Sequence, residues 1–330
     1  MASYRLFGAE TSPYSLKVRT FLQFKGVDFE WIGRSAKTEE AFQAEAQVPT
    51  LPLLIAPDQR RNQDSSSILA GLEAEVSEPC TVPDDAACAS LALLLEDYAD
   101  EWVNKLMVFQ RWGQKPDRDA AGDRAMADLL DGELPRAKKK TRDQIIKRMR
   151  DNLSLVGIEK KNEKVLKPAF ERLFTLLDAH LKTTPFLFGE RPSMADFALS
   201  AQVGQLLMDP TPAAWLTAKA KAVVAWSKSM VSPVAAGPFR SLEALSPTLL
   251  PLIRDEIAQT YLPWATANLA AAEADAPRMS VKIDKKAYDQ VTQHYAARAF
   301  RDLRTAMKAS SDAPGLAAFL EDAGAADLLA

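Results

Sequence analysis

The chain has 330 residues, 47% of them apolar and 26% charged, with a net charge of −3. This composition is ordinary for a globular protein, and the near-neutral charge gives no reason to expect a nucleic-acid partner. Two cysteines without a CxxC pair favour a reducing cytoplasm, and two histidines are too few for a zinc site or a histidine-based triad, so we expect no metal. No apolar run reaches 18 residues and the N-terminus lacks a signal-peptide core, so we expect a cytoplasmic protein with no membrane partner.

Residues 1–76 predict a small α/β domain with a mixed sheet. Ser12 can cap a helix in which Pro13 takes the first position, and Gly26 suits the end of that helix. The expected order is β-α-β-α-β-(β)-α. Strands are expected at Tyr4–Phe7, Phe29–Ile32 and Leu53–Ile55, and helices after Ser12, over Glu39–Glu45 and after Gln63.

The remainder of the chain predicts helices. A proline-rich linker spans residues 77–85, an all-helical domain spans 86–245, and a helical extension spans 246–330. Pro263 is expected to kink or break the first helix of the extension. The helices expected in the extension are Leu249–Ala272, Ala287–Lys308 and a short final one.

Four short motifs occur in an informative order along the chain. They are Ser12-Pro13-Tyr14-Ser15, Leu51-Pro52-Leu53-Leu54-Ile55, Gln63-Asp64-Ser65-Ser66 and Arg191-Pro192-Ser193-Met194-Ala195-Asp196. In the fourth motif, Ser193 can cap a helix while Asp196 reaches back to the Ser193 amide. Together the motifs resemble a cytosolic glutathione S-transferase over roughly residues 4–245, and the long tail is similar to that of a serine-type bacterial subgroup.

The resemblance implies the glutathione transferase fold. In that fold a thioredoxin-like α/β domain binds glutathione and an all-α domain follows it, and this chain adds extra C-terminal helices. The implied ligands are glutathione as co-substrate and a hydrophobic small-molecule acceptor, with a role in detoxification. Homodimers are common in the family, but the sequence does not itself demonstrate one, and the tail can block or rearrange the usual dimer surface.

The resemblance also implies a cis proline before the third strand. There the backbone of the preceding residue can pair with the cysteinyl backbone of glutathione, as a strand edge takes an added strand. Pro49 and Pro52 compete for this role. The family usually places its acidic-Ser pair about a dozen residues after the cis proline, and Pro52 precedes Asp64 by 12 residues. This spacing favours Pro52, with Leu51 as the backbone partner.

Asp64 and Ser65 suit the γ-glutamyl end of glutathione. The Asp64 carboxylate can meet the ammonium, and the Ser65 hydroxyl and the helix amides can bind the carboxylate. The alternative is that both residues only cap the helix. The glycine end usually needs a cation, which Lys37 or Arg34 can supply, although either can equally be a solvated surface residue.

Ser12 is the candidate catalytic residue because glutathione brings its own nucleophile. A free thiol has a pKa of about 8.5, and a hydroxyl hydrogen bond together with a helix N-terminus favours the thiolate. Serine cannot form a mixed disulfide, so addition, substitution or peroxide reduction is favoured over a glutaredoxin-like cycle. Ser15 is the alternative hydroxyl. Phe7 occupies the neighbourhood in which other family branches carry a tyrosine.

The acceptor pocket is expected between the two domains. Its apolar wall can be formed by Tyr14, Tyr98, Trp102, Phe109 and Trp112. Phe109 and Trp112 are three residues apart and share a helix face. The alternative is that these rings belong to the core.

Two functions from different classes therefore stand. The first is a glutathione transferase with Ser12 stabilising the thiolate for attack on an electrophilic or peroxidic apolar molecule; lyase or isomerase chemistry would use the same activation. The second is a non-catalytic glutathione-binding or interaction protein that retains the fold. The extension, which can cover the site or recruit a partner, keeps the second function open.

Overall fold

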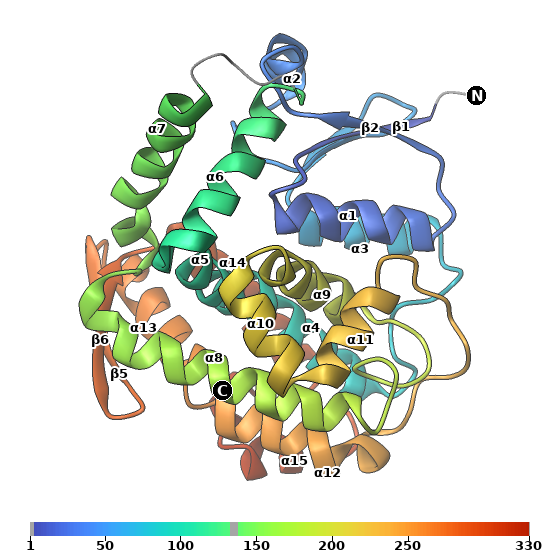
Figure 1. The fold of residues 1–330 in the computed structure, drawn as a ribbon. Helices are drawn as coiled ribbons and strands as arrows, with labels where there is room; N and C mark the ends of the chain where they lie inside the picture. The colour runs from blue at the N-terminus through green and yellow to red at the C-terminus, as the bar shows by residue number, and fades with distance from the viewer. Residues whose placement is uncertain (1–2, 133–137, 330) are drawn as a thin grey trace.

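A four-stranded sheet with three helices forms the N-terminal part, and helices form most of the rest of this computed structural model (Figure 1). The structure describes residues 3–132 and 138–329. The N-terminal elements are β1 (Tyr4–Gly8), α1 (Pro13–Phe24), β2 (Phe29–Gly33), α2 (Glu39–Glu45), β3 (Leu53–Ile55), β4 (Arg61–Gln63) and α3 (Ser65–Glu75). The strand order is β2-β1-β3-β4, with β1 parallel to β2 and β3 antiparallel to both neighbours. The predicted fold class is confirmed.

Successive side chains of β1 pack on opposite faces of the sheet. Leu6 packs in a cluster with Val18 of α1 and Ile68 of α3, whereas Phe7 packs in a separate cluster with Phe42 of α2. Successive side chains of a strand point to opposite faces, which explains the two clusters. Figure 1 shows α2 on one side of the sheet and α1 and α3 on the other.

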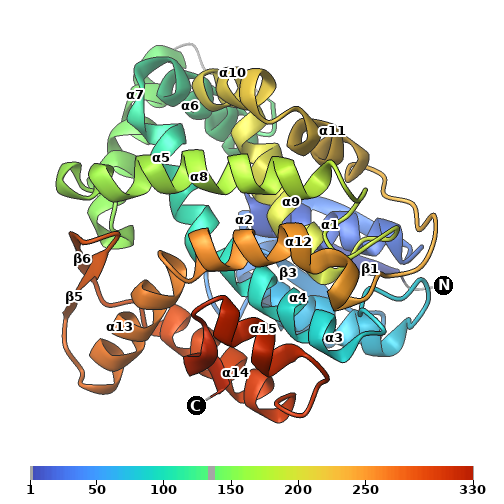
Figure 2. The same cartoon turned by 90° about the horizontal axis from the view of Figure 1, so that it is seen from below.

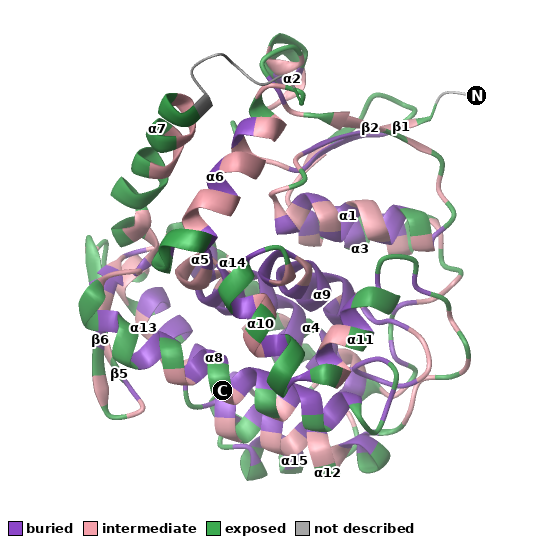
Figure 3. Ribbon diagram, viewed as in Figure 1, coloured by how far each residue is buried: buried purple, intermediate pink, exposed green. Residues whose placement is uncertain are grey.

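The helical part is built around one mostly buried helix, α9 (Figure 3). Phe197 of α9 packs edge-to-face on Phe21 of α1 at a centroid distance of 5.1 Å, which joins the two parts. The predicted capping box is present, because the Ser193 amide donates to Asp196 Oδ2 at 2.9 Å. No helix within the described residues is long and apolar enough to cross a bilayer. The helices are α4 (Ala86–Tyr98), the π-helical turn η1 (Ala99–Val103), α5 (Asn104–Gly113), α6 (Lys115–Leu129), α7 (Lys138–Asp151), α8 (Glu163–Leu181), α9 (Met194–Leu207), α10 (Pro210–Lys219) and α11 (Lys221–Ser229).

The C-terminal extension contains a β-hairpin that the sequence pattern did not predict. The expected break near Pro263 is confirmed, since α13 starts two residues before it. The predicted helix Ala287–Lys308 is wrong in its first residues, which belong to β6. Helix α12 (Leu242–Leu252) spans the boundary predicted between residues 245 and 246, so the extension begins within this helix. The elements that follow are the π-helical turn η4 (Ile253–Ile257), α13 (Tyr261–Glu273), β5 (Arg278–Ile283), β6 (Lys286–Val291), α14 (His294–Ala309), α15 (Leu316–Asp322) and the 3-10 turn η5 (Ala326–Leu329).

The hairpin has a local physical cause. Met279 and Ile283 alternate with exposed residues along β5, which is the period of a half-buried strand. Asp284 and Lys285 take left-handed φ angles of 49° and 63°, as both central residues of a tight type I′ turn do. The short polar turn therefore ends the first strand and starts the second before the helical pattern begins.

The extension shares one hydrophobic core with the helical part. Tyr98 and Trp102 have no exposed surface, and rings from the extension pack on them. The centroid distances are 5.7 Å from Tyr98 to Tyr261, 5.8 Å from Trp102 to Trp264 and 5.9 Å from Trp102 to Tyr288. Figure 2 shows α14 beside α4. The extension is therefore an integral part of the folded molecule.

A buried glutamate in the extension makes the stability of the fold depend on pH. Glu256 in η4 has no exposed surface and accepts hydrogen bonds from Arg172 Nε at 2.7 Å and Thr260 Oγ1 at 2.9 Å. Burial raises the pKa of Glu256 to about 7, against the lowering effect of Arg172. Between the ordinary pKa of 4.5 and about 7, the folded protein therefore keeps a proton that the unfolded chain releases.

Glu256→Gln is expected to remove this pH dependence. Stability falls with rising pH wherever the folded state binds more protons, so the wild type loses free energy of unfolding between pH 4.5 and pH 7. From pH 4.5 to pH 7, the free energy of unfolding of the variant should therefore rise by about 3 kcal/mol relative to that of the wild type. Urea unfolding of both proteins at several pH values measures the difference. The exposed Glu243→Gln on α12 is the control, and an equal slope for all three proteins contradicts the prediction.

Candidate functional site

Strand register brings the sequence motifs to one edge of the sheet. Phe7 near the end of β1 pairs with Leu53 at the start of β3, and Leu53 pairs with Gln63 at the end of β4. The segments after β1, before β3 and after β4 therefore meet at the same edge. These segments carry Ser12, Leu51-Pro52 and Asp64, in that order.

Ser12 caps helix α1. Its backbone is extended, with φ −100° and ψ 113°, and its Oγ accepts a hydrogen bond from the Ser15 amide at 3.2 Å. A hydroxyl that accepts such a bond still carries a proton to donate. Ser12 is half-buried, whereas Ser15 is fully buried and its Cβ faces Gly8. Of the two serines, only Ser12 has exposed surface at the start of the helix.

The loop that carries Ser12 is held by the helical part. Asp128 Oδ2 on α6 accepts from the Thr11 amide at 3.0 Å and from Thr11 Oγ1 at 2.6 Å. Arg111 donates to the Thr11 carbonyl at 3.3 Å, and Gln205 donates to the Glu10 carbonyl at 2.8 Å. These bonds fix the loop between the sheet and the helices.

The Leu51-Pro52 peptide bond is cis, which confirms the proline chosen from the spacing. Gln63, at the end of β4, secures the loop before it. Its Oε1 accepts from the Gln47 and Val48 amides at 2.7 and 3.0 Å, and its Nε2 donates to the Val48 and Thr50 carbonyls at 2.8 Å each. The sequence motif included Gln63 but did not indicate this positioning role. A long amide at the end of an edge strand was the available signal.

Asp64 holds the start of α3 and one residue of the extension. Its φ of 106° lies in the left-handed region, which is costly for a residue with a side chain. Oδ1 accepts from the Ser66 amide at 3.0 Å and the Ser67 amide at 3.3 Å, while Oδ2 accepts from the Tyr295 hydroxyl at 2.6 Å. Ser65 begins α3 and is buried. No local pattern indicated Tyr295, because it lies 231 residues away.

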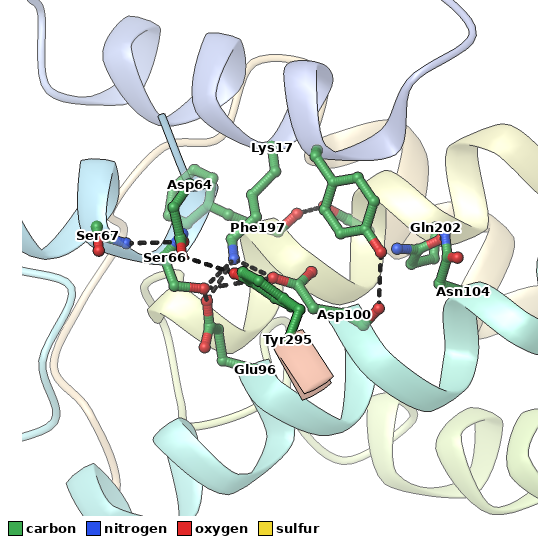
Figure 4. Close-up of polar contacts among 12 residues, drawn as sticks. Lys17, Asp64, Ser66, Ser67, Glu96, Asp100, Asn104, Phe197, Gln202 and Tyr295 are labelled. Atoms are coloured by element: carbon green, nitrogen blue, oxygen red, sulfur yellow. Dashed lines mark hydrogen bonds and ion pairs between the residues drawn. The ribbon is translucent and has the colours of Figure 1, made fainter. Parts of the chain in front are cut away.

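A buried charge cluster lies beside Asp64 (Figure 4). Lys17 of α1 donates to Asp100 at 2.6 Å, to Ser66 at 3.3 Å and to Glu96, and Ser66 Oγ donates to Glu96 at 2.5 Å. Burial opposes the charge of Lys17, but the carboxylates of Asp100 and Glu96 outweigh it and raise the lysine pKa above its ordinary value. Burial raises the pKa of Asp100 to about 6, despite Lys17.

The five rings proposed for the acceptor wall separate in the structure. Tyr98 and Trp102 lie in the core under the extension, so they do not line a wall. Tyr14 is half-buried and donates its hydroxyl to the Asp100 carbonyl at 2.8 Å, and burial raises its pKa well above the ordinary value. Phe109 and Trp112 line a groove of about 820 Å³ formed by α5, α6, α7 and the start of α8. The wall predicted from the sequence is therefore not one surface.

The two cations proposed for the glycine end differ in their contacts. Lys37 is exposed and forms an ion pair with Asp131 at 3.3 Å. Arg34 donates twice to Glu39, at 2.8 Å each, and its guanidinium lies 3.9 Å from the centroid of the Phe42 ring. Arg34 thus forms a bidentate ion pair with a neighbouring helix, whereas the ion pair of Lys37 is exposed to solvent.

Comparison with known structures gives similar proteins at low identity. A glutathione S-transferase from Rhodospirillum rubrum F11 is 17% identical, with 76% of this chain and 91% of that chain covered and a TM-score of 0.46. One from Methylobacterium radiotolerans JCM 2831, in complex with glutathione sulfonate, is 21% identical, with coverages of 72% and 96% and a TM-score of 0.45. A Tau class enzyme from mango is 22% identical, with coverages of 76% and 98% and a TM-score of 0.40. No curated protein sequence matches the chain significantly.

Family comparison identifies both parts of the fold. The glutathione S-transferase N-terminal domain matches residues 6–79, which contain the sheet and its three helices. The glutathione S-transferase C-terminal domain matches residues 144–229, which contain the central helix α9. The first match spans most of the α/β part, and the second spans the helical part from within α7 to the end of α11. The chain therefore carries the N-terminal and C-terminal domains of the glutathione S-transferase family, over residues 6–79 and 144–229.

Proposed function

We propose that the protein is a glutathione transferase in which Ser12 stabilises the glutathione thiolate for attack on an electrophilic or peroxidic apolar molecule. The observation that carries this proposal is the meeting of Ser12, Leu51-Pro52 and Asp64 at one edge of the sheet. Each segment offers the group that one portion of the tripeptide needs. The γ-glutamyl ammonium meets the Asp64 carboxylate, and the γ-glutamyl carboxylate meets the amide end of α3 at Ser65.

The cysteinyl portion is placed between these ends. The backbone of Leu51, before the cis bond, pairs with the cysteinyl backbone and sets its thiol toward Ser12. Lys37 is the cation proposed for the glycine carboxylate. The binding mode therefore follows the sheet edge from α3 to α1.

Ser12 then acts on the sulfur. The Ser12 hydroxyl can donate its proton to the thiolate while its oxygen still accepts the hydrogen bond from the Ser15 amide. The N-terminus of α1 also favours the negative charge of the thiolate. The thiol proton leaves to solvent, the sulfur bonds to the electrophilic atom of the acceptor, and the leaving group takes the electron pair. Ser15 is buried and the Tyr14 hydroxyl is committed to Asp100, which supports Ser12 as the donor.

Calorimetry with glutathione, combined with ultraviolet absorbance of the bound thiolate across pH, tests the proposal. We expect micromolar to millimolar binding and a thiol pKa below that of free glutathione. Absence of binding, or binding with an ordinary thiol pKa, removes the proposed activation by Ser12.

A non-catalytic glutathione-binding protein is the second candidate function. The observation that favours it is the extension, which bonds to Asp64 through Tyr295 and covers Tyr98 and Trp102. An ordinary thiol pKa together with tight glutathione binding would support this function over the first.

A further inference from the structure

The extension reaches the proposed glutathione site through the hydroxyl of Tyr295. Tyr295 lies in the first turn of α14, outside both matched domains, and donates to Asp64 Oδ2 at 2.6 Å. Figure 4 shows its ring beside Asp64, next to Lys17, Glu96 and Asp100. Tyr295 is 51% exposed and Asp64 is half-buried, so a ligand from solvent can reach this pair.

Hydrogen bonds and core packing hold the start of α14, and with it Tyr295, in place. Asn268 of α13 fixes the residue before α14, because it donates to the Gln293 carbonyl at 2.9 Å and accepts from the Gln293 amide at 2.9 Å. Lys105 also donates to the Gln293 side chain at 2.8 Å, and Phe300 anchors the helix in the core. The hydroxyl is thus held beside Asp64 by the folded extension.

The surroundings of the hydroxyl favour a cation. Burial, the bond to Asp64 and the charges of Asp64, Glu101 and Asp100 all raise the pKa of Tyr295, so the phenol stays protonated and donates. Lys17 pairs with Glu96 and Asp100, and the second oxygen of Asp100 is buried without a hydrogen-bond partner among the described residues. Arg298 also lies near the pair, with its guanidinium carbon 5.1 Å from the centroid of the Tyr295 ring. The acids around the pair, Asp64, Glu96, Asp100 and Glu101, still outnumber the cations Lys17 and Arg298.

We propose that Tyr295 is a glutathione-binding residue that selects the γ-glutamyl ammonium together with Asp64. This inference rests on the proposed function. Asp64 Oδ1 is filled by two amides, but Oδ2 keeps a free lone pair beside the Tyr295 bond. A phenol that donates to a carboxylate is also a stronger acceptor. Two N–H groups of the ammonium thus bond to Asp64 Oδ2 and Tyr295 Oη, which completes the subsite with a residue from the extension.

Calorimetry on the full chain tests this role with two probes, glutathione and deaminated glutathione, which lacks only the γ-glutamyl ammonium. Tyr295→Phe is expected to weaken glutathione binding about tenfold and to leave binding of the deaminated analogue unchanged. The selectivity between the probes should fall by the same factor. Tyr4→Phe is the matched control, because Tyr4 donates to the exposed carboxylate of Glu75 at 2.8 Å, and it should preserve both affinities.

The outcomes separate this inference from the proposed function. If the wild type binds glutathione and Tyr295→Phe binds it equally well or more tightly, Tyr295 is not part of the subsite. Equal weakening of both probes also overturns the role, since it indicates a structural effect, which the melting temperatures of the two variants check. If the wild type does not bind glutathione, the proposed function fails and the inference fails with it.

Discussion

Ser12→Ala is expected to return the pKa of the bound glutathione thiol toward about 8.5 and to lower kcat/KM at neutral pH by roughly tenfold or more. The reason is that alanine removes the hydroxyl proton, while the backbone N–H of residue 12 already donates to the Ala9 carbonyl. A shift of one pKa unit corresponds to about 1.4 kcal/mol. Thiolate absorbance across pH measures the pKa, and initial rates with an electrophilic aryl halide or an organic hydroperoxide measure kcat/KM.

Two controls separate activation from capping, since Ser12 also stabilises α1. Loss of an N-cap costs about 1 kcal/mol by itself. Ser241→Ala removes a comparable cap, because Ser241 Oγ accepts from the Ala244 amide at the start of α12. It should lower stability without changing the thiol pKa. Ser12→Thr keeps a hydroxyl and should restore most of the activity. An unchanged thiol pKa in Ser12→Ala is incompatible with the proposed mechanism.

The N-terminal elements were predictable because their signals are local. A capping serine before Pro13 sets the start of α1, and Asp64 sets the start of α3, each within one helical turn. The cis bond at Leu51-Pro52 followed from the family's spacing to Asp64. The helix starts are decided by neighbours in the chain, so the sequence pattern is sufficient for them, whereas the cis bond was predicted from the resemblance to the family.

The tertiary partners were not predictable in the same way. A helical stripe that contains Tyr98 and Trp102 indicates an apolar face, but not whether a ligand or the extension covers it. The partners that cover this face, Tyr261, Trp264 and Tyr288, are more than 150 residues away in the chain. An even larger separation in sequence, 231 residues, lies between Asp64 and Tyr295. A single sequence carries no signal for such contacts.

Lys17 is another such case, because no local sequence signal indicates that this lysine of α1 faces inward. It is 1% exposed and lies on the same helix as the buried Val18 and Phe21. Its charge is balanced only after α4 and η1 bring Glu96 and Asp100 to it. Because Ser66 joins the same cluster, Lys17 also connects the start of α3 to the helical part.

Lys17→Met is therefore expected to lower the free energy of unfolding by about 3–5 kcal/mol. Methionine fills most of the volume, but two carboxylates then remain buried beside each other without a cation. The start of α3 should also lose its support, so glutathione binding should weaken. Urea unfolding followed by tryptophan fluorescence measures the stability, and calorimetry measures the binding.

The cause of this loss can be isolated by neutralising the partners. In the triple variant Lys17→Met, Glu96→Gln, Asp100→Asn, no unpaired charge remains in the cluster, so most of the lost stability should return. If the loss came instead from poor packing of methionine, the triple variant would be no more stable than Lys17→Met. Recovery of stability without recovery of glutathione affinity would show that the charges of the cluster, and not only its packing, hold Ser66 and Asp64 in position for the ligand.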